Sequence, residues 1–298
     1  MKIKKTKDVI VFRTISYVVT TLFALACLIP FVMMISGSLS SEKYIITKGY
    51  SIIPRGFNSL AYKILFQDPK ILINAFNVSV LVTLIGTISS VFINSLTAYA
   101  LCRKNFKFRN QAALFYYFTT LFNGGLVPYY IMMIKYYHLK NNPFVLIVPG
   151  IASVWNMLVL RNFIKNDIPE SLIESSKIDG AGEFRIYWSI VLPLMKPALM
   201  AIGFFTAIGY WNDWYTPMLF IDKPSLYPLQ YQLYRMLNTI NFLIQNASKM
   251  NTGNQHMELP SETVKLAMAV IASAPIVFLY SFMQKYFVKG ITIGAVKG

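Results

Sequence analysis

The sequence predicts an all-α integral membrane protein with six transmembrane helices, and two observations carry that prediction. Of the 298 residues, 55% are hydrophobic and only 13% are charged, whereas soluble domains contain about 25% charged residues. Several apolar runs reach or approach the roughly 20 residues that a helix needs to cross a bilayer. Since a helix satisfies its own backbone hydrogen bonds inside lipid, we expect these runs to be helical.

Six apolar runs are the expected spans. The first follows four lysines, as in a signal peptide, but it continues well beyond Cys27, so we expect an uncleaved helix. Prolines occur in or beside several runs, and membrane helices tolerate them because neighbouring helices satisfy the freed carbonyls. From hydropathy and length, the spans lie at 14–37, 76–101, 112–134, 144–162, 198–221 and 264–288.

The distribution of lysine and arginine orients these spans. With the N-terminus inside, 17 of the 28 basic residues fall in cytoplasmic segments, which is the bias that the positive-inside rule describes. The densest cluster, RKNFKFR at 103–109, contains no acid and marks the loop after the second span as cytoplasmic. Both termini are then cytoplasmic, and the net charge of +16 reflects topology and contact with anionic lipid rather than nucleic-acid binding.

The spans divide the chain into four parts. In the last outer loop, the polar stretch Asn246–Glu262 is typical of a loop that meets water or a soluble partner, although a connector without a partner fits as well. The parts are 1–13 (cytoplasmic N-terminus), 14–75 (first helix and outer segment), 76–290 (a core of five helices, with an inner loop at 163–195 and an outer loop at 222–263) and 291–298 (cytoplasmic tail).

The sequence contains no catalytic or metal-binding pattern. Cys27 and Cys102 lie within or at the end of apolar runs and do not form a disulfide framework. The two histidines lack the cysteine spacing of a zinc site. The phosphate-binding pattern G-x-x-x-x-G-K-[ST] is absent, as is a nucleophile–base constellation. We therefore expect no catalytic residue, no metal and no nucleotide site on this chain.

The polar segment between the fourth and fifth spans is the most informative part of the sequence. IPESLIESSKID, at 168–179, has a proline and acids at its start, which are helix-start signals. Gly180 and Gly182 interrupt it, and EFRIYWSIVLPL, at 183–194, predicts a second short helix with one apolar face. From these residues alone, the segment is either an ordinary amphipathic interface segment or a knob that a cytoplasmic protein holds.

The spacing within this segment resembles a known signature. Glu174, two small residues, Gly180 and the Ile-x-Leu-Pro ending at 190–193 are similar to the pattern E-A-A-x3-G-x9-I-x-L-P. That pattern marks the membrane subunits of binding-protein-dependent ATP-binding-cassette (ABC) importers. Ser175 and Ser176 replace its two alanines and keep the small size that close helix docking needs.

Three further regions resemble the carbohydrate-uptake branch of this family, in particular the second membrane subunit of maltose-type importers of oligosaccharides and polysaccharides. The resemblance covers nearly the whole chain, and the first 70 residues are the least diagnostic. The similar stretches are FNGGLVPYYIMM (122–133) with HLKNNPFVLIVPG (138–150), YWNDWYTPMLFI (210–221) with LYPLQ (226–230), and the terminal KGITIGAVKG (289–298).

The resemblance implies a type I ABC importer permease fold with cytoplasmic coupling helices, in a bacterial cytoplasmic (inner) membrane. It implies a second homologous permease subunit in a heterodimer, two cytoplasmic ABC ATPase subunits that bind ATP and Mg, and an extracytoplasmic solute-binding protein. No cofactor is expected on this chain. Closure of the ATPase pair would push on the polar segment and rock the helices between inward-open and outward-open states.

Specific residues are expected to carry this coupling. Glu174 is expected to contact a basic residue of the ATPase, Gly180 to supply the sharp turn, and Pro193 to start the fifth span at the membrane edge. The full coupling set is Glu174, Ser175, Ser176, Asp179, Gly180, Ala181, Gly182, Ile190, Leu192 and Pro193, and the tail expected at the ATPase interface contains Gly294, Val296, Lys297 and Gly298.

An aromatic and polar cluster is the candidate lining of the substrate path. Asp213 lies about 15 residues into the fifth predicted span, roughly 22 Å from its inner end, where an ionisable group should face a wet cavity or a partner. Aromatic faces can stack on sugar rings while Asn and Asp bind hydroxyls, but Trp and Tyr also form the interfacial belt of any membrane helix. The candidates are Tyr210, Trp211, Asn212, Asp213, Trp214, Tyr215, Asn123 and Asn94. For Asn94, Asn123 and Asn156, an interhelical hydrogen bond is favoured over a ligand contact.

The sequence leaves the transported solute and two alternative functions open. Lys223, Arg235 and Lys249 would favour an acidic, uronate-bearing glycan, or would dock an acidic binding protein, or have no role. A permease of the same family for a non-sugar solute is one alternative. An ATP-independent secondary transporter is another, and it should show an internal repeat or intramembrane charge pairs; no clear repeat is present.

Overall fold

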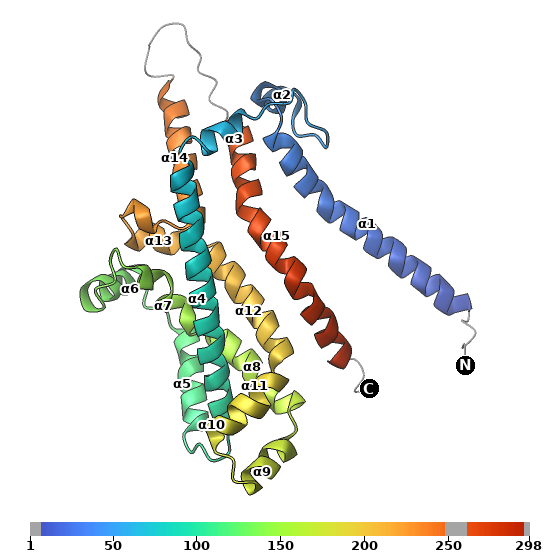
Figure 1. Ribbon diagram of the computed structural model, residues 1–298, viewed down its shortest axis with the longest axis vertical. Coiled ribbons are helices and arrows are strands. Elements are labelled where there is room, and N and C mark those ends of the chain that lie inside the picture. The colour runs from blue at the N-terminus through green and yellow to red at the C-terminus, as the bar shows by residue number, and fades with distance from the viewer. Residues whose placement is uncertain (1–6, 248–260, 295–298) are drawn as a thin grey trace. The chain divides into compact units, whose positions relative to one another are not determined.

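The computed structural model describes residues 7–247 and 261–294, and within them all regular structure is helical, with no β-strand (Figure 1). The chain divides into two compact units. Unit 1 comprises residues 1–69 and 235–274, and unit 2 comprises residues 70–234 and 275–298.

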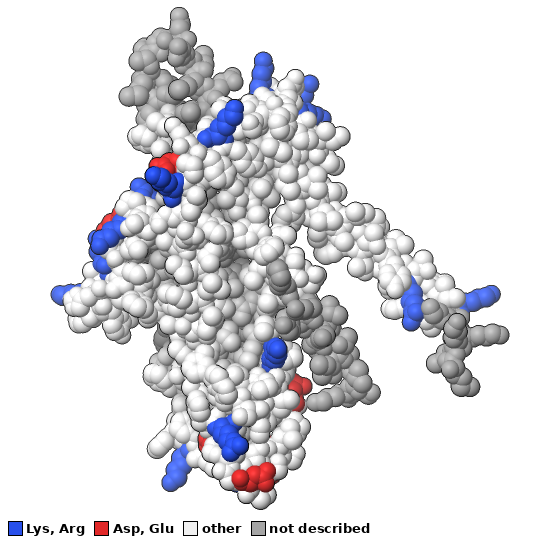
Figure 2. All heavy atoms as spheres, in the orientation of Figure 1, with Lys and Arg blue, Asp and Glu red and all other residues white. Residues whose placement is uncertain are grey.

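Unit 1 contains a long apolar helix and, after it, a short helix whose first residue caps the start of a second long helix. The stretch of α1 that could span a membrane has none of its residues buried against other described parts of the chain, and on the face shown in Figure 2 its charged side chains lie near its N-terminal end. The Glu42 carboxylate accepts the backbone N–H groups of Glu262 (2.8 Å) and Thr263 (2.9 Å) and so caps α15. The helices are α1 (Lys7–Ser38), α2 (Glu42–Lys48), α3 (Leu60–Leu65), the later part of α14 (Leu229–Ala247) and the first part of α15 (Ser261–Gly294).

Unit 2 is organised around α4, which runs from Pro69 to Cys102. One face of α4 carries small or short polar side chains every three or four residues, and all of them are buried. Small residues let membrane helices approach closely, which explains how a helix with so little bulk on one face packs against its neighbours. The residues of this face are Ala75, Ser79, Thr83, Gly86, Ser90, Asn94 and Ala98.

The third predicted span, 112–134, is not one continuous helix. α5 (Arg109–Leu121) ends before Phe122, and α6 (Leu126–Ile131) starts after Gly125 and continues as a π-helical turn to Tyr136. The cause is local: Gly125 has a φ of +85°, which favours glycine, and the Asn123 Oδ1 accepts its N–H at 2.8 Å.

The fourth and fifth predicted spans are bent. The 143–151 stretch meets α8 (Val154–Asp167) at 43°, and the 183–194 stretch meets α12 (Lys196–Trp211) at 78°. α1, α4 and the 261–281 part of α15 are long and apolar enough to span a bilayer, and the bent pairs raise the number to five at most. The six predicted spans are therefore not confirmed within the described residues. The intervening elements are a 3-10 turn (Pro143–Leu146), α7 (Val148–Ile151), α13 (Tyr215–Phe220) and a second 3-10 turn (Pro224–Leu226).

The predicted end of the fifth span is wrong. The helix of the fifth span ends at Trp211 rather than at 221, because the chain breaks before α13. The expected outer segment 222–263 contains the 19-residue helix α14, of which Leu229, Tyr231 and Leu233 are buried. Most of the polar stretch 246–262 lies outside the described residues.

Candidate functional site

The polar segment forms two short helices, as predicted. α9 (Glu170–Ile178) begins directly after Pro169. It ends in a Schellman motif, in which the Ala181 N–H donates to the Ser176 carbonyl (2.9 Å) and the Gly180 N–H to the Lys177 carbonyl (3.0 Å). Gly180 has a φ of +77°, a conformation that favours glycine. α10 (Glu183–Ile186), a π-helical turn (Tyr187–Val191) and α11 (Leu192–Leu194) follow.

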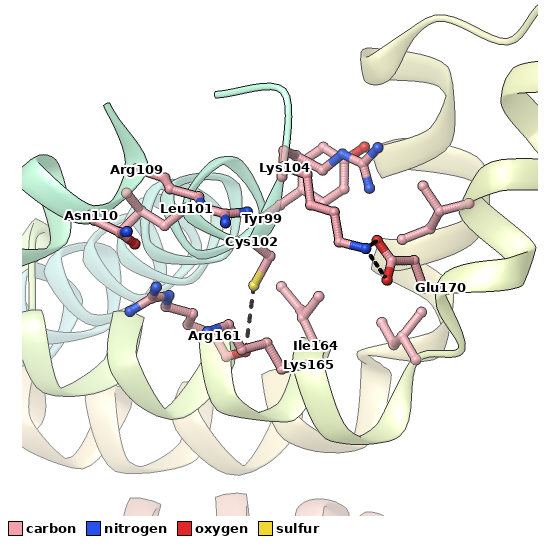
Figure 3. Close-up of a pocket in the computed structure, with 13 residues that line it drawn as sticks. Tyr99, Leu101, Cys102, Lys104, Arg109, Asn110, Arg161, Ile164, Lys165 and Glu170 are labelled. Carbon is pink, nitrogen blue, oxygen red and sulfur yellow. Dashed lines mark hydrogen bonds and ion pairs between the residues drawn. The ribbon is translucent and has the colours of Figure 1, made fainter. Parts of the chain in front are cut away.

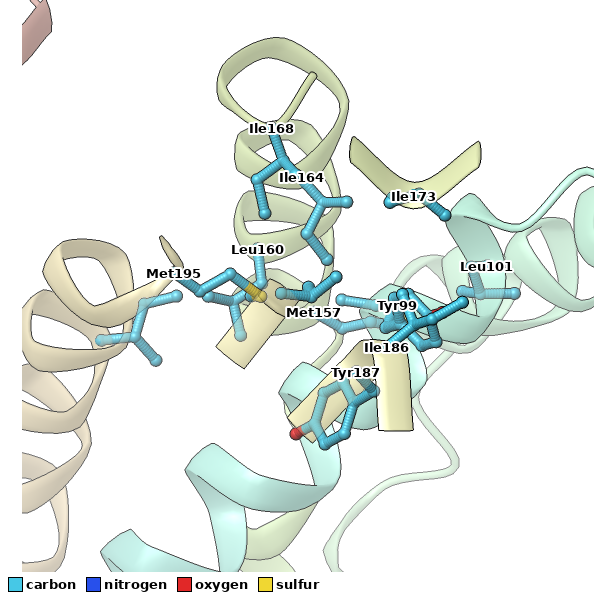
Figure 4. Close-up of a cluster of buried hydrophobic side chains, with 13 residues drawn as sticks. Tyr99, Leu101, Met157, Leu160, Ile164, Ile168, Ile173, Ile186, Tyr187 and Met195 are labelled. Carbon is cyan, nitrogen blue, oxygen red and sulfur yellow. The ribbon is translucent and has the colours of Figure 1, made fainter. Parts of the chain in front are cut away.

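The inner face of this segment is anchored in a hydrophobic cluster of unit 2 (Figure 4). Ile173 of α9, Ile186 of α10 and Leu160 of α8 are buried members of this cluster. Tyr187 is fully buried, and its hydroxyl lies 2.8 Å from the Ser95 Oγ of α4. The segment is therefore packed firmly onto the helices that precede and follow it.

The outer face of the segment exposes large apolar side chains. Ile178, at the end of α9, is 87% exposed, and Phe184 of α10 is 67% exposed. The Phe184 ring stacks on that of Trp188, which is itself half exposed. Exposed apolar side chains of this size are typical of a surface that contacts a protein or a membrane.

An ionic cluster around Glu183 holds the two short helices to α4. The Tyr99 hydroxyl donates to the Glu183 Oε2 (2.6 Å), and the same oxygen lies 3.0 Å from the Arg103 Nε. The Lys177 Nζ of α9 lies 2.8 Å from the other oxygen, Oε1. The sequence prediction missed Glu183, because only its place at a helix start was visible, whereas its partner Tyr99 is 84 residues away.

A second ion pair joins α9 to the basic turn 103–109. The Lys104 Nζ lies 2.7 Å from a Glu170 carboxylate oxygen. The hydrogen bond from Lys104 lowers the pKa of the Glu170 carboxyl from its ordinary value of 4.5. Both side chains are well exposed, so this pair is weaker than the cluster around Glu183.

The predicted coupling residues fall on this segment, with one correction. Glu174 is exposed on α9 and has no hydrogen bond or ion pair among the described residues. Ser175 and Ser176 donate back to the Leu172 carbonyl. Pro193 does not begin the fifth span, because it lies in α11, before the 78° bend. The remaining members are Asp179, Gly180, Ala181 and Gly182 in the turn, Ile190 in the π-helical turn and Leu192 in α11.

The tail and the outer bases can be placed only in part. Gly294 is the last residue of α15, and Val296, Lys297 and Gly298 lie outside the described residues. Lys223 is exposed after α13.

Some of the aromatic and polar candidates line one cavity of about 470 Å³ in unit 2. Tyr210 and Asp213 line it together with Asn156. Asp213 is not inside a helix, contrary to the prediction: it follows α12, and its Oδ1 accepts the N–H groups of Tyr215 (3.0 Å) and Thr216 (2.9 Å) at the start of α13. Helix capping thus explains this carboxylate as well as ligand binding does.

The other aromatic and polar candidates lie apart from that cavity. Trp214 stacks on Tyr234 at 4.6 Å between ring centroids, and the Asn212 Oδ1 accepts a hydrogen bond from Gln230. Asn123 and Tyr215 line a different cavity. Trp211 is buried with its ring edge-on to that of Phe76.

Asn94 is a structural residue. It is buried, its Oδ1 accepts the Ser153 N–H (3.0 Å), and its Nδ2 donates to the Ile151 carbonyl (2.8 Å). Both partners lie where α7 meets α8, so Asn94 satisfies the backbone groups that this bend leaves free. The alternative of an interhelical hydrogen bond is thereby confirmed for Asn94.

Comparison with known proteins agrees with this geometry. Residues 9–293 match the family described as "Binding-protein-dependent transport system inner membrane component". "Polygalacturonan/rhamnogalacturonan transport system permease protein YtcP" of Bacillus subtilis (strain 168) is 36% identical, covering 96% of this chain and 98% of its own. "Arabinooligosaccharides transport system permease protein AraQ" of the same organism is 27% identical, with 93% of each covered. A chain from a "bacterial ABC transporter involved in the import of the acidic polysaccharide alginate" superposes with a TM-score of 0.75 at 26% identity, covering 96% of this chain and 100% of its own.

Proposed function

The chain belongs to the family of inner membrane components of binding-protein-dependent transport systems, and from this premise we propose that it is a permease subunit of an ATP-driven oligosaccharide importer. It lies in the bacterial cytoplasmic membrane with both termini in the cytoplasm. It forms the translocation path with a second, homologous permease subunit. Two ATPase subunits, which bind ATP and Mg, and an extracytoplasmic solute-binding protein complete the assembly.

The observation that carries this proposal is the exposed face of α9 and α10. The segment is anchored to unit 2 through Ile173 and Tyr187, yet it exposes Ile178 and Phe184 and leaves Glu174 without a partner among the described residues. A surface with exposed apolar side chains and a free acid fits a protein partner with a matching apolar pocket and a basic side chain. We assign that partner as the ATPase, because the spacing from Glu174 to Pro193 resembles the signature of ABC importer membrane subunits.

Coupling then follows from rigid-body mechanics. The segment packs on α4 and α8 through a continuous buried cluster, so a displacement imposed on α9 moves those helices with it. ATP-driven closure of the two ATPase subunits supplies that displacement, and the helices rock between inward-open and outward-open states. No bond is made or broken on this chain.

The substrate class is supported mainly by the relatives. The names of the similar proteins refer to polygalacturonan, rhamnogalacturonan and arabinooligosaccharides, and the similar structure imports alginate. We therefore propose an oligosaccharide, and a uronate-bearing one as the more specific form. The cavity lined by Tyr210, Asn156 and Asp213 is the candidate contact surface on this subunit, since it combines an aromatic ring with hydroxyl-binding groups.

ATP hydrolysis by the purified complex tests the proposal. The complex that co-purifies with this chain is placed in lipid and given its binding protein with neutral or uronate-containing oligosaccharides. We expect stimulation by the uronate-containing set, and loss of that stimulation in Glu174→Lys. Asp8→Lys is the matched control, because it reverses the charge of an exposed acid on α1, outside the coupling segment, and it should leave the stimulation unchanged. A complex without ATPase would refute the coupling assignment, and hydrolysis indifferent to every sugar would refute the substrate.

A further inference from the structure

A strongly basic cavity lies next to the two short helices in unit 2 (Figure 3). It has a volume of about 290 Å³, and its walls come from the end of α4, the turn 103–109, the start of α5, the end of α8 and the start of α9. It is not part of the exposed face assigned to the ATPase. Its lining includes one acid, Glu170, and five bases, Arg103, Lys104, Arg109, Arg161 and Lys165.

Three of these bases lack a counter-charge among the described residues. Arg103 pairs with Glu183, and Lys104 pairs with Glu170. In the described part of the chain, no carboxylate lies within ion-pair distance of the other three, which are Arg109, Arg161 and Lys165. Like charges gathered around one cavity repel each other, so an anion in that cavity would relieve the repulsion.

A buried polar atom also indicates that a hydrogen-bond acceptor is missing at this cavity. The Arg161 Nε is buried and has no hydrogen-bond partner, which costs free energy unless a ligand or water accepts its hydrogen. Figure 3 places Arg109, Asn110 and Arg161 on one side of the cavity and Lys104 with Glu170 on the other. Two arginines and an asparagine thus line the same cavity, and guanidinium donors match the oxygens of a phosphate.

We propose that this cavity binds a phosphate group, carried by an anionic lipid of the inner leaflet or by a soluble phosphate ester. The volume is about ten times the roughly 30 Å³ that one water occupies in the liquid, which is enough for a phosphate and its neighbouring atoms. The turn that forms one wall also exposes Phe106 and Phe108 between its bases. Exposed aromatic side chains beside basic ones are typical of contact with a membrane surface, so the lipid is the favoured source.

Lipid retention by the full chain, purified with its associated subunits, tests the site. Native mass spectrometry would count bound phosphatidylglycerol against phosphatidylcholine in wild type, Arg161→Gln and Lys165→Gln. Lys107→Gln is the matched control, because Lys107 lies in the same turn but does not line the cavity. We expect about fivefold weaker retention of phosphatidylglycerol for each base removed from the cavity, and no change in the control. Lys165 is exposed, so its variant remains informative if Arg161→Gln fails to fold.

A titration with inorganic phosphate and with glycerol phosphate, which is not an ATPase ligand, distinguishes the two sources. Weaker binding of either anion in the same two variants, without preference for phosphatidylglycerol, would assign the site to a soluble phosphate ester. Equal retention of phosphatidylglycerol in all variants, together with equal binding of phosphate and of glycerol phosphate in wild type and variants, would overturn the proposal. Each outcome is independent of the transported sugar, so it does not depend on the proposed substrate.

Discussion

The substitution Glu183→Gln tests whether the ionic cluster fixes the position of the coupling segment. Glutamine keeps the shape of the side chain but removes the charge that Arg103 and Lys177 share. The Tyr99 hydroxyl, at 2.6 Å, also loses a charged acceptor. The change therefore weakens three contacts that join α4, α9 and α10 without altering the packing.

The expected cost follows from the exposure of each partner. A hydrogen bond to a charged group contributes about 1.5–3 kcal/mol, part of which glutamine retains as a neutral acceptor. The ion pairs with Arg103 and Lys177 are partly exposed, and such pairs contribute about 0.2–1 kcal/mol each. The Arg103 side chain is only 14% exposed, so leaving it unpaired adds to the loss. Together these losses should lower the free energy of local opening of the segment by about 1–3 kcal/mol.

Hydrogen exchange of the purified complex in lipid measures this opening. At about 1.4 kcal/mol per factor of ten, the amides of α9 and α10 should exchange about 5- to 150-fold faster in Glu183→Gln. Glu170→Gln is the matched control, because it removes only the exposed ion pair between Lys104 and the first residue of α9. It should change the exchange rates little. Equal protection in the two variants would refute the assigned role of Glu183.

Three further outcomes are expected. Gly86→Ala should lower the free energy of unfolding by about 1–3 kcal/mol in thermal unfolding, because the added Cβ would lie 2.6 Å from the Tyr210 ring. Gly203→Ala is the control, since its Cβ would lie 3.5 Å from the nearest side-chain atom, and it should leave stability unchanged. Equal effects of the two substitutions would contradict the packing. Asn94→Ala should cost about 1–3 kcal/mol in the same assay, since two buried backbone groups at the α7–α8 bend lose their partners, and a neutral result would contradict that role. The pKa of Glu170 is lowered by its ion pair with Lys104. The wild type should therefore be more stable than Glu170→Gln above pH 4.5, and this difference should disappear as the pH falls through the lowered pKa. A difference that persists at low pH would contradict the ion pair.

Local signals predicted the two short helices α9 and α10 well. The proline and acids before α9, the glycine at 180 and the acid at 183 are start and stop signals that depend on the neighbouring residues alone. The structure places both short helices where these signals indicate. The same reasoning failed at Asp213 and Pro193, because each lies at a break in the chain that hydropathy, averaged over many residues, does not resolve.

The sequence by itself determined the class of protein, the two short helices α9 and α10 and the family, since composition, local helix signals and motif spacing depend on residue order alone. Only the tertiary structure decided which groups meet: Glu183 with Tyr99, Arg103 and Lys177, and Asn94 with the α7–α8 bend. These partners are mostly 57 to 84 residues apart along the chain. Their contacts arise from how bent helices pack, and no periodicity within a single apolar run encodes that packing.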